Sequence, residues 1–150
     1  MPRLESHPAP DRAATAARLR LAVMRLARRL RQQSTADATP SMLSALSVVE
    51  IAGPMTLGEL AALERVRPPT MTRVVSRLEE DGLVARDVDD ADRRVAHVSL
   101  TRAGRELVKR NRSRKDLYLA ARLRRLDATQ VETLRAAVEV IEQLLEEDDQ

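Results

Sequence analysis

The residues of this sequence best suited to chemistry are arginines and hydroxyls on a short predicted helix, residues 68–81. Arg73 and Arg77 are four positions apart and so share one face of that helix. A guanidinium group carries a fork of donors that matches the acceptors on guanine and the oxygens of a phosphate. Thr70 and Ser76 add hydroxyls that can contact phosphates or thymine methyl groups. The combination is suited to the major groove of duplex DNA.

Each of these side chains has an expected role. For Arg73 we expect a base contact, with a phosphate contact and plain solvated surface as the alternatives. For Arg77 we favour a phosphate contact. Thr72 lies on the same outward face as the two arginines. Pro69 and Thr70 stand at the start of the helix, where amide groups and the helix dipole can meet a backbone phosphate.

The elements that position these side chains follow from capping and turn signals. Residues 56–59, Thr-Leu-Gly-Glu, form a capping box that opens one helix. Pro68 and Pro69 open the next, and Gly82 suits the left-handed cap that ends it. The apolar residues expected to be buried in the two helices and their turn are Leu57, Leu60, Ala61, Val66, Met71, Val74 or Val75, and Leu78.

Two short strands follow, over residues 83–86 and 95–100, the second with alternating apolar positions. The residues between them, 87–94, are too polar for a core and are expected to form an extended loop, which we call the wing. Helix, turn, helix and hairpin in this order predict a winged helix-turn-helix over residues 40–101. The fold class is therefore mainly α with a small β-wing.

The tip of the wing contains at least as many acids as bases, which is unusual for a loop that contacts DNA. We interpret Asp92 as the group that orients Arg93 or Arg94, so that one guanidinium enters the minor groove, where negative potential is high. A charge-balanced turn without a DNA contact is the alternative.

Helical periodicity predicts further helices over residues 13–33, 40–52, 102–125 and 128–147. The helix over 102–125 is polar on every side between Lys109 and Lys115, which is typical of a helix that bridges two lobes through solvent. In the helix over 40–52, the expected buried residues are Met42, Leu43, Leu46, Val49 and Ile51. The last helix has a coiled-coil-like seam, formed by Val131, Leu134, Val138, Ile141 and Leu145.

This seam and the amphipathic N-terminal helix predict that both chain ends build a dimer interface; an intrachain helix pair is the alternative. The expected organisation is a disordered arm over residues 1–12, which contain three prolines, followed by one domain over 13–150. Within that domain, residues 13–35 and 102–150 form the dimerisation helices, and residues 40–101 form the DNA-binding lobe.

Composition excludes several kinds of chemistry. One Tyr and no Phe or Trp leave almost nothing for base stacking, on which many proteins that bind RNA or single strands depend. The absence of Cys excludes disulfides and thiol redox sensing, and two His residues in unrelated contexts predict no metal site. No catalytic triad or glycine-rich phosphate loop is present, so we expect neither an enzyme nor a cofactor. No apolar run approaches the ~18 residues of a membrane span, and we expect a cytoplasmic protein.

The net charge of +3 conceals four blocks of alternating sign. Residues 1–35 carry a net charge of +6, residues 36–101 of −4, residues 102–125 of +8 and residues 126–150 of −7. Such blocks indicate interaction surfaces. Pairing of basic and acidic helices with each other in a dimer explains them equally well.

Several segments match a known pattern: residues 56–61, 69–79, 81–86, Asp92-Arg-Arg94, and residues 98–104 with Leu-Thr-x-x-Gly. In these segments, and in the order of its helices over roughly residues 15–147, the chain resembles the MarR (multiple antibiotic resistance regulator) family of winged helix-turn-helix transcription factors. The Asp-Arg-Arg to Leu-Thr-x-x-Gly run is fairly specific among winged-helix proteins.

The resemblance implies an obligate homodimer, joined through its N- and C-terminal helices, that binds a pseudo-palindromic operator, usually as a repressor. It makes residues 68–81 the recognition helix and Arg94 the minor-groove arginine. It also implies release of DNA by a small phenolic or other anionic aromatic ligand, held between the two lobes. The walls of that ligand site would come from the helices at 13–33, 40–52 and 102–125.

The sequence departs from the family pattern at Arg65, in a turn where glycine is common, and lacks the cysteine of peroxide-sensing relatives. The expected function is a sequence-specific regulator of transcription that binds double-stranded DNA as a homodimeric repressor. One alternative is a non-specific architectural DNA-binding protein, which the basic segment 102–125 supports. Another is a protein-interaction module that keeps a winged-helix shape without using DNA.

Overall fold

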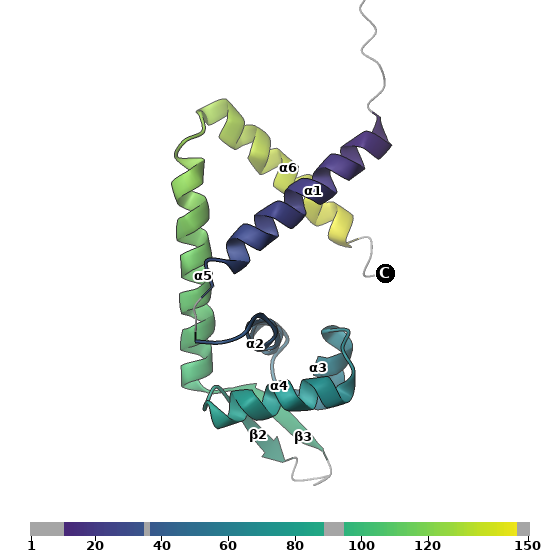
Figure 1. The fold of residues 1–150 in the computed structure, drawn as a ribbon, viewed down its shortest axis with the longest axis vertical. Coiled ribbons are helices and arrows are strands. Elements are labelled where there is room, and N and C mark those ends of the chain that lie inside the picture. Colours follow the sequence, from purple (N-terminus) through teal and green to yellow (C-terminus); the bar gives the residue numbers. More distant parts are fainter. Residues whose placement is uncertain (1–10, 35–36, 89–94, 147–150) are drawn as a thin grey trace, which may run out of the picture.

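The computed structural model describes residues 11–34, 37–88 and 95–146 (Figure 1). In Figure 1 a compact lobe lies at one end, two helices cross at the other, and one long helix runs along the side between them. The elements in chain order are α1 (Arg12–Arg31), α2 (Pro40–Ala52), β1 (Met55–Thr56), α3 (Leu57–Leu63), α4 (Pro68–Glu80), β2 (Val84–Val88), β3 (Ala96–Leu100), α5 (Arg102–Leu123) and α6 (Ala128–Glu146).

The helix boundaries follow the capping signals of the sequence. The capping box predicted at the start of α3 is confirmed: the Thr56 hydroxyl accepts from the Glu59 amide at 3.2 Å, and the Glu59 carboxylate accepts from the Thr56 amide at 2.7 Å. The left-handed cap after α4 is also confirmed, because Gly82 has φ +69°. At the N-terminus, α1 begins one residue earlier than predicted, and Asp11 of the predicted arm caps it.

The three strands form one antiparallel sheet in the order β1-β3-β2. β2 extends two residues beyond its predicted end, so that Val88 lies opposite Ala96 and the wing loop is shorter than expected. β1 was not predicted at all. It contributes only two residues, Met55 opposite Val98 and Thr56 opposite His97, and two residues carry no periodic signal.

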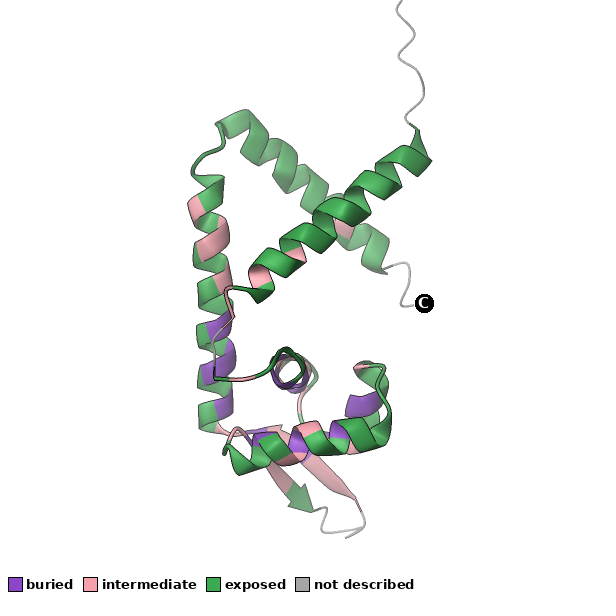
Figure 2. Cartoon of the chain, in the orientation of Figure 1, coloured by how far each residue is buried: buried purple, intermediate pink, exposed green. Residues whose placement is uncertain are grey.

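The buried apolar side chains all lie between Met42 and Val108, in the winged lobe and the first half of α5 (Figure 2). Of the two valines left open, Val75 is the fully buried one. The prediction for Ile51 was wrong: it is 84% exposed. It follows the buried Val49 by two positions, which is about 200° around a helix and therefore the opposite face. The prediction that Val66 is buried was also wrong, because its side chain is exposed. The turn is closed by the backbone instead, through a hydrogen bond of 3.0 Å from the Val66 amide to the Ala61 carbonyl.

The junction between the hairpin and α5 explains the Leu-Thr-x-x-Gly pattern. The Thr101 hydroxyl donates to the Gly82 carbonyl at 2.7 Å and accepts from the Gly104 amide at 3.1 Å. A methyl group on Gly104 would overlap the carbonyl oxygen of Leu83. Glycine is therefore required where α5 approaches the backbone of the lobe.

The sequence predicted that the polar middle of α5 runs through solvent. In the structure, part of it packs against the winged lobe instead. Asn111 is only 5% exposed, packed against the winged lobe. Next to it, Arg112 forms an ion pair with Glu50 of α2. These contacts fix the lower half of α5 to the lobe, and the upper half extends away from it (Figure 1).

The terminal helices contribute no buried residue to the structure of the single chain (Figure 2). Most of the predicted α6 seam is exposed, including Val131, Leu134, Val138 and Leu145. α1 likewise exposes Leu19 and Leu26. The intrachain pairing considered as an alternative therefore leaves both apolar faces open.

Candidate nucleic-acid interface

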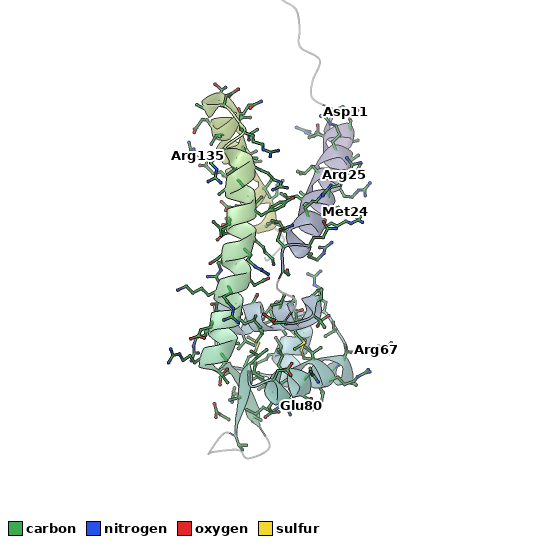
Figure 3. All side chains as sticks on the ribbon, turned by 60° about the vertical axis from the view of Figure 1, so that its left-hand side comes forward. Asp11, Met24, Arg25, Arg67, Glu80 and Arg135 are labelled. Atoms are coloured by element: carbon green, nitrogen blue, oxygen red, sulfur yellow. The ribbon has the colours of Figure 1, made fainter. Side chains whose placement is uncertain are left out.

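The recognition helix predicted at residues 68–81 is α4, and its inner face is fixed by the core. Met71, Val75 and Leu78 are buried and hold α4 against the lobe. Arg73 follows Met71 by two positions, or about 200° around the helix axis, and so lies on the opposite side. Figure 3 shows Arg67 and Glu80, at the two ends of α4, in the lobe at the opposite end of the molecule from the terminal helices.

Arg73 is exposed, and its guanidinium makes no hydrogen bond or ion pair with any other residue that the structure describes. The donors of its fork are therefore available to a ligand. Arg77 differs, because its side chain lies 3.2 Å from a carboxylate oxygen of Asp81 and 3.7 Å from one of Glu80. These two acids partly neutralise Arg77, although it is 64% exposed.

Two of the predicted hydroxyls are engaged within the protein. The Thr72 hydroxyl donates to the Pro68 carbonyl of its own helix at 3.0 Å. The Ser76 hydroxyl accepts a hydrogen bond of 3.1 Å from Arg86, which lies on β2. Neither side chain is as available as Arg73, and contacts from them to DNA stay predictions.

The start of α4 differs from the expectation of free amide groups. Pro68 and Pro69 have no amide hydrogen, and the Thr70 amide is bonded to the Arg67 carbonyl at 2.9 Å. The amide of Met71 is bonded to the same carbonyl, at 3.2 Å. Of the groups predicted to meet a phosphate there, the helix dipole and the exposed Thr70 side chain remain.

Two further arginines, Arg65 and Arg67, are exposed just before α4. Neither of them was among the candidate DNA contacts predicted from the sequence. Arg65 adopts φ +53°, the left-handed conformation for which glycine is common at this turn. The turn geometry is thus kept without glycine, and a charged side chain is added beside the recognition helix. The signal for both residues was their place in the turn, next to the predicted contact helix.

The predicted wing residues Asp92, Arg93 and Arg94 lie outside the described residues. The base of the wing is described: Asp87 of β2 accepts a hydrogen bond of 3.3 Å from Ser99 of β3. Arg86, one position earlier, was also missed by sequence reasoning. The feature of the sequence that could have indicated Arg86 is its place as the one charged residue at the end of an otherwise apolar predicted strand.

Other kinds of site find little support in the described ranges. They contain no group of three or more His, Cys, Asp or Glu residues placed to hold a metal ion. No helix in the part of the chain that the structure describes is both long and apolar enough to cross a membrane. The arrangement of α3, α4 and the hairpin, with an unengaged arginine on the outer face of α4, is that of a nucleic-acid interface.

Comparison with known proteins agrees with this geometry. A model of the MarR family matches residues 38–96. An HTH-type transcriptional regulator of Mycobacterium leprae is 43% identical over 130 residues, which are 86% of this chain and 91% of that protein. The chain belongs to the MarR family. This MarR protein is thus a DNA-binding regulator of transcription, and its winged helix-turn-helix is the fold predicted from the sequence.

Solved structures of other proteins align with this chain over most of its length. A transcriptional regulator protein of Pseudomonas aeruginosa aligns with a TM-score of 0.81 and 32% identity, over 92% of this chain and 98% of that one. A mutant of S. aureus MepR, bound to an oligodeoxyribonucleotide, aligns with a TM-score of 0.68 and 21% identity, over 87% of this chain and 97% of that one. The second likeness concerns the fold alone.

Proposed function

We propose that this protein is a homodimeric repressor that binds a pseudo-palindromic operator sequence-specifically through α4 and the wing. The observation that carries the proposal is Arg73, which stands on the outer face of α4 and has no hydrogen bond or ion pair with another described residue. In a helix-turn-helix, side chains at this place contact base edges in the major groove. Arginine is the commonest side chain in specific contacts there, through guanine.

The proposal that the protein is a dimer is supported by the terminal helices. Leu19 and Leu26 in α1, and Leu134 and Val138 in α6, are each more than a third exposed in the single chain. Large apolar side chains exposed at helical spacing are typical of an interaction face. The two chain ends also have opposite charge, +6 over residues 1–35 and −7 over residues 126–150, which suits contact between copies.

In such a dimer the two copies of α4 would contact half-sites about 10 base pairs apart, one turn of the duplex. By its resemblance to the family, Arg94 would enter the minor groove beside each half-site, with Arg93 next to it and Asp92 orienting the pair. Arg77 would contact a phosphate. Pro69 and Thr70, at the start of α4, would lie against the backbone.

Release by a small ligand is supported by a cavity of about 520 Å³ beside α2 and α5. The cavity is lined by Asn111, whose side-chain oxygen has no hydrogen-bond partner among the described residues although it is buried. Arg31 and Lys115 also line it and supply positive charge. The anionic aromatic ligand implied by the family resemblance would place its carboxylate toward these two cations, and Glu64 is the one acid that the described residues add to the lining.

The proposed function is tested by competition. Operator candidates from DNA selection are titrated by mobility shift at physiological salt, with random duplex as competitor. A sequence-specific regulator keeps a preference of ~10³-fold or more for its operator. Equal competition by random duplex would support the architectural alternative, and absence of duplex binding even at low salt would support the protein-interaction module.

Repression and ligand release are tested separately. A reporter behind the selected operator should fall in expression when the protein is present, and a rise would contradict repression. A hydroxybenzoate should weaken DNA binding of the wild type but act less on Lys115→Gln, which removes one of the two cations that line the cavity. Lys115→Gln must still bind the operator for this comparison to count. An equal response of both proteins would place ligand action elsewhere.

A further inference from the structure

Arg86 connects the wing hairpin to the recognition helix. It lies on β2, opposite Val98 of β3, and its side chain is 27% exposed. Its Nε atom is 3.1 Å from a carboxylate oxygen of Glu79, at an angle outside that of a hydrogen bond. Its terminal nitrogen donates to the Ser76 hydroxyl at 3.1 Å. We call this arrangement of Arg86, Glu79 and Ser76 the Arg86 bridge.

The geometry of the bridge restricts two motions. Ser76 and Glu79 are three positions apart, so they lie one above the other on one flank of α4. A guanidinium that contacts both is held at two points and opposes rotation of α4 about its axis. Because Arg86 belongs to a paired strand, the same contacts oppose tilting of the hairpin relative to α4. Partial burial reduces the solvent screening that weakens exposed ion pairs.

We infer that Arg86 is a positioning residue for DNA binding, which fixes the β2–β3 hairpin relative to the recognition helix and thereby the spacing between the contacts of these two elements on the duplex. This inference rests on the proposed function. A hairpin held at a fixed place loses less freedom on binding, so its contact contributes more to affinity. A hairpin free to tilt would contact DNA with a larger entropic cost and at variable spacing.

One consequence concerns Ser76, for which the sequence predicted a DNA contact. In the bridge its hydroxyl accepts from Arg86 and orients the guanidinium toward α4. Ser76 therefore acts through Arg86, and Ser76→Ala should resemble a weak form of an Arg86 variant. A direct contact to phosphate would instead make Ser76→Ala independent of Arg86.

The experiment is hydroxyl-radical footprinting of the operator with full-length protein, at concentrations that saturate the centre of each half-site. The variants are Arg86→Gln, Arg86→Lys, Glu79→Gln and Ser76→Ala. Protection at the outer flanks, where the wing is placed, should weaken by about three- to tenfold for Arg86→Gln, while the base preference at the centre is kept. Arg86→Lys keeps the charge but lacks the fork, so it should restore flank protection only in part.

The matched control is Arg102→Gln, which breaks the exposed pair of Arg102 with Glu106 on α5 and removes no contact of the Arg86 bridge. It should leave the footprint unchanged. If Arg86→Gln unfolds, Glu79→Gln and Ser76→Ala remove the α4 side of the bridge and leave Arg86 in its strand. Equal loss at centre and flanks in all of these variants would overturn the inference, since that is the pattern of a merely structural role. A wild type without a specific footprint would instead refute the proposed function.

Discussion

Arg73 and Arg77 carry the same side chain four residues apart, yet their surroundings differ. Arg73 has no partner among the described residues, whereas Arg77 is paired with Asp81 and Glu80. We expect Arg73→Ala to weaken operator binding by ~1–3 kcal/mol and to relax preference at one base pair. Arg77→Ala should cost less, because Asp81 and Glu80 already neutralise part of the charge of Arg77. Its loss should be equal on all sequences, because a phosphate contact carries no sequence information.

The measurement is a binding titration on the operator and on single-base variants of it, at several salt concentrations. A uniform loss across all sequences for Arg73→Ala would contradict a base contact and leave a phosphate contact. For Arg77→Ala, the slope of log affinity against log salt should become shallower by about 1, which corresponds to the loss of one phosphate contact. An unchanged slope would remove Arg77 from the interface.

At the scale of elements, the attachment of α5 to the lobe depends on one glycine. A methyl group at Gly104 would meet the Leu83 carbonyl, and backbone cannot move aside as a flexible side chain can. We expect Gly104→Ala to destabilise the protein by ~2 kcal/mol or more, through forced separation of α5 from the hairpin. Denaturant unfolding followed by circular dichroism measures this loss.

Gly58 provides the matched control, because it lies inside α3 and its nearest neighbour to an added methyl group is the Thr56 hydroxyl oxygen at 4.0 Å. Gly58→Ala should therefore leave the stability unchanged or raise it by less than the ~1 kcal/mol that alanine gains over glycine in a helix interior, because Gly58 lies in the first turn of α3. Similar destabilisation by both substitutions would show that the close approach at Gly104 is not the cause.

The capping box of α3 makes a pH-dependent contribution to stability. Hydrogen bonds from the Thr56 amide and hydroxyl lower the pKa of Glu59 below its ordinary value, with a smaller contribution from the charge of His97. A lowered folded-state pKa stabilises the protein above the unfolded value, about 4.3, and this stabilisation is lost as the pH falls through the folded value. Glu59→Gln keeps an acceptor without the charge.

We therefore expect Glu59→Gln to be less stable than the wild type at pH 7, and the difference to shrink at an acid pH below the lowered pKa, where Glu59 is protonated. Unfolding midpoints at the two pH values measure the difference. A gap between the proteins that persists unchanged at the lower pH would mean that the charge of Glu59 has no part in the cap.

The sequence predicted most accurately the features that depend on neighbouring residues. The caps at Thr56 and Gly82 require only a few adjacent side chains, and both are confirmed. β1 and the burial of Asn111 depend on residues distant in the sequence, so no local pattern indicated them. The Arg86 bridge joins a strand to the preceding helix, and its partners cannot be chosen without the packing of the two elements. Caps and periodicity supplied the order of the helices, and the family resemblance agreed with it, but neither showed which hydroxyls of α4 are engaged within the protein.

At the scale of the whole molecule, the core and the exposed apolar surface are separated. The core lies in the winged lobe, and the terminal helices carry their apolar residues on open faces (Figure 2). A single chain thus has a folded DNA-binding lobe and an incomplete second lobe. The proposed dimer would complete it, and would place two recognition helices on one duplex.

Val138 tests this arrangement because it lies within the α6 seam and is 44% exposed in the single chain. Val138→Glu places a charge in the proposed interface, so sedimentation should show monomers at micromolar concentration. Operator affinity should fall by about 10²-fold or more, since the second half-site contact is no longer tethered to the first. Val140→Glu, about 200° from Val138 on the same helix and also exposed, is the control and should remain dimeric. A dimeric Val138→Glu protein with full affinity would show that the seam is not the interface.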